Sequence, residues 1–148
     1  MTYGMRSPGH VALVSPTWPP GSVSNGVITY VANVRQGMQE EGVSSLVLSV
    51  LNQAGPPDPA AIYLEEERRK SSALALAESA CQKLFKDDWL GRSLGIGVAA
   101  ALRRLPKAQR PEVLEMEESF GGSAWAQLML DMLVVTRLHG PWFVGGPA

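Results

Sequence analysis

Apolar residues near the start of the chain predict a buried strand followed by a loop. Residues 10–15 (HVALVS) form a continuous apolar run without polar alternation, which is typical of a strand covered on both faces. We expect Pro16 to end this strand. Residues 17–26 are so rich in Pro, Gly and Ser that they predict a loop and exclude a helix there.

A helix is expected directly after this loop. Ser24 or Asn25 is suited to be its N-cap, and Gly42 is suited to end it. The apolar residues between them recur at the spacing of one helical face: Val27, Val31, Val34 and Met38. Residues 43–51 (VSSLVLSVL) then predict a second strand, so this part of the chain is expected to form a βαβ unit with parallel strands.

The rest of the chain continues the alternation. Residues 112–117 predict a third strand, whose alternating glutamates favour the edge of the sheet or a strand end that faces a site. Ser123 is in position to cap a short helix that runs to Asp131, and residues 133–138 predict a fourth strand. Two helical stripes precede these elements: Leu74, Ala77, Cys81 and Leu84, then Val98, Leu102 and Leu105. We therefore expect an α/β fold, a Rossmann-like parallel sheet with helices on both faces.

Composition is consistent with one domain that needs no covalent or metal support. The chain has 148 residues, of which 45% are hydrophobic and 18% charged, with a net charge of −1. One cysteine and two histidines cannot form a disulfide framework or a zinc site, so we expect no structural metal and no cofactor. The near-neutral charge disfavours nucleic acid as a partner. Without a secretory signal or a membrane-spanning run, the expected location is the cytoplasm.

One segment carries a marked excess of positive charge. Residues 83–110 contain seven basic side chains and two acidic ones. Because Arg103, Arg104 and Lys107 flank an apolar helical stripe, this segment is a candidate for peripheral contact with an anionic membrane. A solvated helical face explains the same pattern.

Candidate ligand contacts follow the predicted strands. In open α/β sheets, ligands bind beyond the carboxyl ends of the strands, where the strand order reverses. Gly26 begins a helix, so its backbone can approach a phosphate or another polar group. Neither the dinucleotide fingerprint nor the P-loop is present. An ordinary capped helix remains the alternative interpretation.

Two further segments offer polar groups at strand ends. Glu118 lies beside the Gly121-Gly122 turn and can accept hydrogen bonds from ligand hydroxyls, or it can be a solvated strand end. His139 follows the last strand and precedes Gly140, where an imidazole can bind a sugar hydroxyl or transfer a proton, or simply cap the strand. Arg137 can pair with a glutamate on the adjacent strand or bind an anion.

Three stretches together resemble the amino-terminal half of family 4 glycosyltransferases, which have the two-domain GT-B architecture. Residues 10–20 with 24–31 look like the first strand, its proline-containing loop and the glycine that opens the first helix. Residues 39–48 are similar to the family's helix end and second strand. Residues 113–125 with 134–141 look like the strand, glycine turn, helix and strand that end at the family's histidine. Asn25-Gly26 departs from the family's usual paired glycines.

The resemblance implies an incomplete amino-terminal domain, residues 1–148, without the carboxyl-terminal domain that holds the nucleotide-sugar. The expected activity of the whole protein is transfer of a sugar from a nucleotide-sugar donor to a hydroxyl of a glycan or lipid acceptor, with retention of configuration. The implied substrate contacts are Ser24, Asn25, Gly26, Glu118, Gly122 and Gly140, with His139 as the catalytic residue. We expect the isolated chain to be inactive.

Other function classes fit the same pattern of elements. A non-catalytic flavodoxin-like or receiver-like interaction module is one, although a receiver needs acidic residues where this chain has Ser15-Pro16. A small nucleotide-binding or cofactor-binding enzyme complete in itself is another, and the absence of phosphate-binding fingerprints weighs against it.

Overall fold

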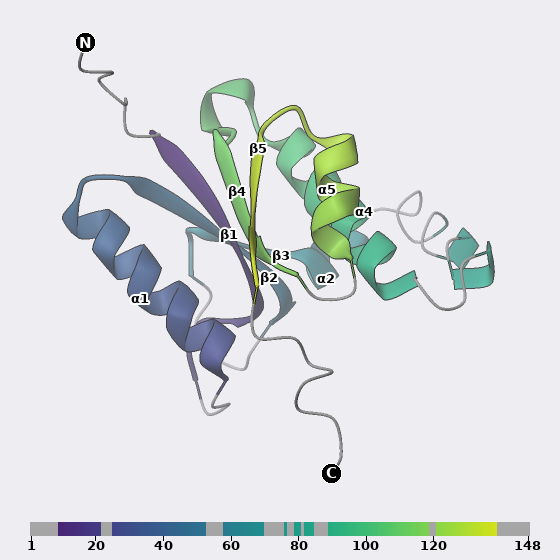
Figure 1. Ribbon diagram of the computed structural model, residues 1–148, viewed down its shortest axis with the longest axis horizontal. Helices are drawn as coiled ribbons and strands as arrows, with labels where there is room; N and C mark the ends of the chain where they lie inside the picture. Colours follow the sequence, from purple (N-terminus) through teal and green to yellow (C-terminus); the bar gives the residue numbers. More distant parts are fainter. Residues whose placement is uncertain are drawn as a thin grey trace.

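The structure is a computed structural model that describes residues 9–21, 25–52, 58–69, 76, 79–80, 82–84, 89–118 and 121–138. Strands and helices alternate along most of this length, as Figure 1 shows. The elements are β1 (His10–Trp18), α1 (Gly26–Glu40), β2 (Ser44–Asn52), β3 (Ala61–Tyr63), α2 (Leu64–Arg69), α4 (Trp89–Arg104), the 3-10 turn η1 (Lys107–Gln109), β4 (Val113–Glu117), α5 (Gly122–Met129) and β5 (Leu133–Arg137).

The five strands form one parallel sheet in the order β3-β2-β1-β4-β5. Strands β2 and β3 therefore lie on one side of β1, and the chain then crosses over to add β4 and β5 on the other side. This is the strand order of the Rossmann class, whereas flavodoxin-like folds have the order 2-1-3-4-5. The predicted α/β class with a Rossmann-like parallel sheet is confirmed.

Each face of the sheet buries its own apolar cluster, because successive side chains of a strand point to opposite faces. On one face, Val11, Leu13 and Val47 pack with Val31 of α1. On the other face, a larger cluster joins the strands to α2, α4 and α5: Ala12, Val14, Leu48, Leu64, Val98, Ala99, Ala101, Leu102, Leu114, Met116, Ala126 and Leu130. Figure 1 shows α1 on one side of the sheet and α4 with α5 on the other.

Helix α1 begins and ends where the sequence predicts. Asn25 is the N-cap, and its side-chain Oδ1 accepts a hydrogen bond from the backbone N–H of Val27 at 2.8 Å. Gly42 follows the helix with a φ of +72°, a conformation that favours glycine. Val31 is fully buried, while Val27, Val34 and Met38 are partly buried beside it. The predicted apolar stripe is therefore the face that packs on the sheet.

Several predicted boundaries are wrong. Strand β1 continues past Pro16 to Trp18. Within the described residues the pairing of β1 with β4 stops at Leu13, so Pro16 lies beside β2 alone. The N–H group that proline lacks is therefore tolerated at this position. Strand β3 was not predicted, since three residues are too few to show a period. The N-cap of α5 is Gly121, with a φ of +74°, and not Ser123.

Of the two alternatives for the glutamate-bearing strand, a place at the edge of the sheet is wrong. Strand β4 lies between β1 and β5. Its alternation separates the two faces, with Leu114 and Met116 fully buried beneath the helices and Glu115 and Glu117 on the face that carries α1. The Glu115 carboxylate is tolerated inside the sheet because it pairs with Arg137 of β5 at 2.7 Å.

The apolar stripe beside the basic segment belongs to the core. Val98 and Leu102 are buried, and Leu105 packs against them. The Arg104 guanidinium forms an ion pair of 2.7 Å with Glu67, and Arg103 donates to the backbone oxygen of Met129. A helix that turns its apolar face to the sheet does not offer that face to lipid. The other predicted stripe contains Leu74, Ala77 and Cys81, which lie outside the described residues.

A polar cluster fixes the segment before β3 to α1. The Asp58 carboxylate forms an ion pair with Arg35 of α1 and accepts hydrogen bonds from the Trp18 indole N–H and the Ala60 backbone N–H, both at 2.8 Å. The Tyr63 hydroxyl lies 3.2 Å from the Asp58 backbone N–H and accepts from it. The hydrogen bond from Arg35, followed by that from Trp18, outweighs burial and lowers the pKa of Asp58 from 3.8 to about 2.

We predict that Asp58 makes stability depend on pH in the acid range. Its pKa is lower in the folded protein, so its contribution is present in full above about pH 4 and is lost as the pH falls towards 2. Urea unfolding of the wild type and Asp58→Asn is expected to differ by about 2 kcal/mol at pH 6, and the difference should shrink at pH 2.5. Asp131→Asn, at an exposed position, is the control and should stay within about 0.5 kcal/mol of the wild type. A difference independent of pH contradicts this role.

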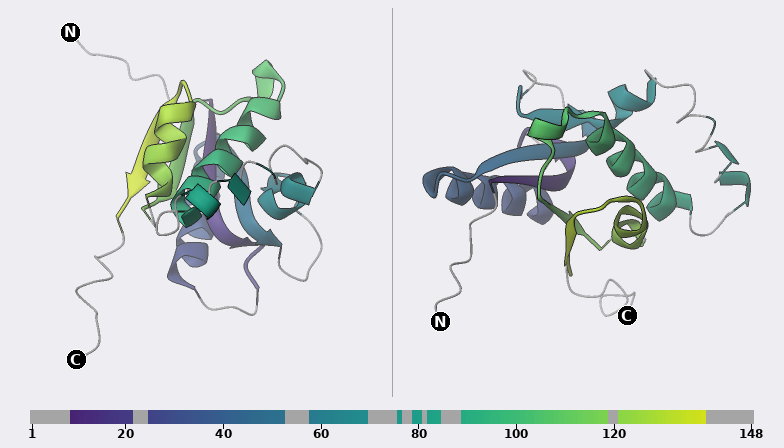
Figure 2. Two further views of the ribbon diagram at one scale, coloured as in Figure 1. Left: turned by 90° about the vertical axis from the view of Figure 1, so that its right-hand side faces the viewer. Right: turned by 90° about the horizontal axis from the view of Figure 1, so that it is seen from above.

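Helices α4 and α5 cross closely at Gly95. A Cβ atom at this position would lie 2.5 Å from the Cβ of Trp125 and 2.8 Å from the backbone oxygen of Gly122. Both views of Figure 2 show the two helices next to each other. Since backbone atoms cannot move away from a new methyl group without moving a helix, Gly95 sets the distance between α4 and α5.

We predict that Gly95→Ala lowers the free energy of unfolding by about 1–2 kcal/mol, because overpacking exceeds the gain in helix propensity. Gly97 of the same helix is the matched control, since a Cβ there would meet nothing within 4 Å. Gly97→Ala should leave stability unchanged or raise it by up to about 1 kcal/mol. Urea titration measures both variants, and equal stabilities would contradict the close crossing.

Candidate functional site

The carboxyl ends of β1 and β4 form the point where the strand order reverses. The two strands are neighbours, and the helices that follow them, α1 and α5, lie on opposite faces of the sheet. Their first turns therefore diverge from one edge of the sheet, at the bottom of Figure 1, which we call the carboxyl rim. This is the position at which open α/β sheets bind ligands.

The start of α1 supplies backbone N–H groups to the carboxyl rim. Asn25 caps the helix, and its backbone oxygen accepts from the N–H of Thr29 at 3.1 Å. A Cβ at Gly26 would meet nothing within 4 Å, so the space beside this residue is open. A polar ligand can approach the backbone here, towards the positive end of the helix dipole.

Glu118 stands on the same rim at the end of β4. Its backbone N–H donates to the backbone oxygen of Arg137 at 3.0 Å, and its carboxylate accepts a hydrogen bond from the hydroxyl of Ser123. Residue Glu118 is exposed, whereas Ser123 is buried in the first turn of α5. The buried hydroxyl thus holds an exposed carboxylate in one orientation.

Gly122 has a different environment from the one predicted. It is buried, and a Cβ there would lie 3.2 Å from Leu94 and 3.3 Å from Met116. These neighbours belong to α4 and to the core face of β4. The position fits close packing of α5 against α4, and nothing in the arrangement favours a ligand contact there.

Arg137 connects the two halves of the rim. Its guanidinium forms an ion pair of 2.7 Å with Glu115 and lies 4.0 Å from the centre of the Tyr30 ring, which belongs to α1. Both charged side chains are only 11% exposed. The predicted pairing of Arg137 with a glutamate on the adjacent strand is confirmed. Through Tyr30, this pair brings the first turns of α1 beside the ends of β4 and β5.

Three of the predicted site residues lie outside the described residues: Ser24, His139 and Gly140. Their roles stay predictions. Of the others, Asn25, Gly26 and Glu118 lie on the carboxyl rim, where strand order and helix direction place them. Within the part of the chain that the structure describes, no three His, Cys, Asp or Glu side chains lie close enough to hold a metal ion. None of the helices in the described ranges has the length and apolar character needed to cross a membrane.

Comparison of the chain with protein-family models, with curated proteins and with solved structures finds no match.

We predict that Arg137→Met destabilises the fold by about 2–3 kcal/mol, because it leaves the partly buried Glu115 carboxylate without its cation. Glu115→Met should cost a similar amount. The double variant Arg137→Met with Glu115→Met should lose less than the sum of the two, because no unpaired charge remains. Thermal or urea unfolding of all four proteins measures this coupling, and strict additivity would contradict the pairing.

Proposed function

We propose that this chain is the amino-terminal part of a sugar-transferring enzyme of GT-B architecture. It supplies the acceptor side and part of the donor cleft for transfer of a sugar from a nucleotide-sugar to a hydroxyl of a glycan or lipid, with retention of configuration. The observation that carries the proposal is the adjacency of β1 and β4, with α1 and α5 starting on opposite faces. Asn25, Gly26 and Glu118 then share one rim.

Strand order favours this proposal over the alternative interaction module. In a flavodoxin-like or receiver-like sheet the order is 2-1-3-4-5, so β1 would lie between β2 and β3. Here β1 lies between β2 and β4. The three stretches that resemble family 4 glycosyltransferases include β1, the start of α1, β2, β4 and β5, which are the elements that build the carboxyl rim.

Each group on the rim has a chemical task in the proposed reaction. The first turn of α1 approaches the donor diphosphate or the acceptor through backbone N–H groups. Glu118, held by Ser123, accepts hydrogen bonds from sugar or acceptor hydroxyls. His139, which follows β5 by two residues, binds the transferred sugar. The chain's contribution is mainly positioning of the reactants. In the glycosyltransferases that this chain resembles, most of the groups that stabilise the leaving diphosphate belong to the second domain.

We predict that nucleotide-sugars bind at the carboxyl rim. In an amide NMR titration of the ¹⁵N-labelled chain with UDP-glucose and GDP-mannose at millimolar concentration, Gly26, Val27 and Glu118 should shift. Residues at the opposite ends of the strands, such as Ser44, should not. Absence of any shift, or shifts confined to the amino ends of the strands, would contradict the proposed site.

Matched variants test the two side chains. Glu118→Gln should weaken binding about tenfold, because a carboxylate acceptor is stronger than an amide. Glu112→Gln, at the amino end of β4, is the control and should leave binding unchanged.

The chain has two histidines, so His139→Ala can be compared with His10→Ala. In the longest natural form of the protein, release of nucleoside diphosphate should depend on His139 and not on His10; the reverse dependence would sink the assignment.

A further inference from the structure

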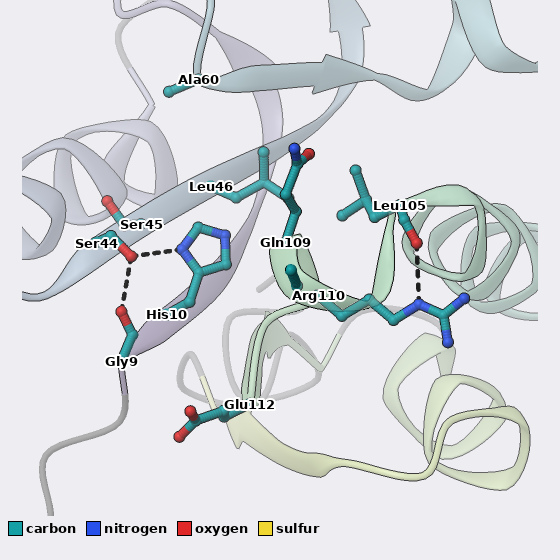
Figure 3. Close-up of a pocket in the computed structure, with 11 residues that line it drawn as sticks. Gly9, His10, Ser44, Ser45, Leu46, Ala60, Leu105, Gln109, Arg110 and Glu112 are labelled. Carbon is teal, nitrogen blue, oxygen red and sulfur yellow. Dashed lines mark hydrogen bonds between the residues drawn. The ribbon is translucent and has the colours of Figure 1, made fainter.

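A pocket of about 560 Å³ lies at the opposite edge of the sheet, among the amino ends of β1, β2 and β4. Figure 3 shows it between the strands and the η1 turn. Its volume falls within the range of about 300–1,000 Å³ that is usual for small-molecule sites. Six of the residues that line it decide its chemistry: His10, Ser44, Leu46, Ala60, Leu105 and Gln109.

Hydrogen bonds hold the His10 ring in one orientation and one tautomer. The Ser44 hydroxyl lies 2.7 Å from the backbone oxygen of Gly9 and donates its proton to it. The same hydroxyl lies 2.6 Å from Nδ1 of His10. Because its one proton is already used, the hydroxyl can only accept from the imidazole, which assigns the Nδ1–H tautomer to the neutral ring. Nε2 is then a hydrogen-bond acceptor, and in Figure 3 it points towards Leu46 and Gln109, into the pocket.

The charged side chains around the pocket are directed elsewhere. Arg110 donates to the backbone oxygens of Leu105 at 3.0 Å and Arg103 at 2.8 Å, and so caps the end of α4. In Figure 3 its guanidinium lies on the α4 side of the pocket, and the Glu112 carboxylate points away from the space between His10 and Leu105. The polar groups that face the space between His10 and Leu105 are therefore Nε2 of His10 and the Gln109 amide, while Arg110 and Glu112 line the pocket at its sides.

The remaining wall is apolar. Leu46 of β2 and Leu105 at the end of α4 line the pocket together with Ala60 and Ala108. An apolar wall with one fixed acceptor selects a ligand with an apolar body and a donor hydrogen. Arg110 is bonded to the end of α4 and Glu112 points away, so neither offers a counter-charge beside His10. We propose that this pocket binds an uncharged heteroaromatic ring through an N–H group that donates to Nε2 of His10. This site is separate from the carboxyl rim, and the proposal does not depend on sugar transfer.

Two ligands that differ only in the donor test this proposal. Indole carries the N–H group, whereas 1-methylindole has a similar apolar body without it. In amide NMR titrations of the full chain, both should shift His10, Leu46 and Ala108, and indole should bind about tenfold more tightly, the value of one well-formed hydrogen bond. Equal affinities, or no shift at these residues, would overturn the proposal.

Variants test whether the preference for indole over 1-methylindole depends on the His10 ring and on Ser44, which orients it. In His10→Ala the indole preference should fall below about twofold, and in Ser44→Ala it should fall to about threefold because the tautomer is no longer fixed. Ser49→Ala is the matched control, since Ser49 lies nearer the other end of β2 and does not line the pocket, and it should keep the full preference. Ring ¹⁵N shifts of His10 in the wild-type chain give a measurement that needs no variant. A protonated Nε2 with a bare Nδ1 would overturn the proposal, as would an unchanged preference in His10→Ala.

Discussion

The carboxyl rim depends on the position of Arg137, the last residue of β5. On the face of the sheet that carries α1, the packing does not extend to β5, where Leu133 is 62% exposed and Val135 is 42% exposed. Apolar packing on this face therefore reaches Val113 of β4 but does not link α1 to β5. The Arg137 guanidinium supplies that link, because it contacts Glu115 on one side and Tyr30 on the other, while its backbone oxygen holds Glu118.

Helix α1 is thus held by polar contacts on both flanks and by apolar packing between them. Arg35 pairs with Asp58 on the side of β3, and Tyr30 meets Arg137 on the side of β5, with the buried Val31 over the centre of the sheet. Charged hydrogen bonds of this kind require specific partners and directions, whereas apolar burial is non-directional. The start of α1 consequently has a defined place at the end of β1, which a binding site built from its backbone requires.

Sequence patterns predicted the parts of the fold that depend on local periodicity. Strand β2, the cap at Asn25 and the apolar face of α1 follow from apolar spacing and a capping residue. The pairing of Arg137 with Glu115 was within reach, because both lie on strands predicted to be parallel neighbours. The missed features join distant residues. Asp58, which precedes the short strand β3, pairs with Arg35 of α1 and accepts a hydrogen bond from Trp18 at the end of β1. The close crossing at Gly95 involves Gly122, which lies 27 residues further along the chain. The glutamates of β4 suggested an edge because the pattern does not show which face is covered.

The parallel sheet also explains why its two rims have opposite chemical characters. All five strands point the same way, so α1 and α5 both present the N–H groups of their first turns, whose dipole favours negative charge, at the carboxyl rim. At the other rim the end of α4 presents carbonyl oxygens, which accept hydrogen bonds from Arg110, and the groups that face the space beside His10 are Nε2 of the imidazole and the Gln109 amide. Strand β1 runs between the two rims with a fully buried centre at Ala12 and Leu13. A ligand at either rim would therefore stabilise the same central strand against unfolding. The stabilising free energies of the two ligands should add unless one ligand shifts β1 along its neighbours. The paired registers of β1 with β2 and with β4 oppose such a shift.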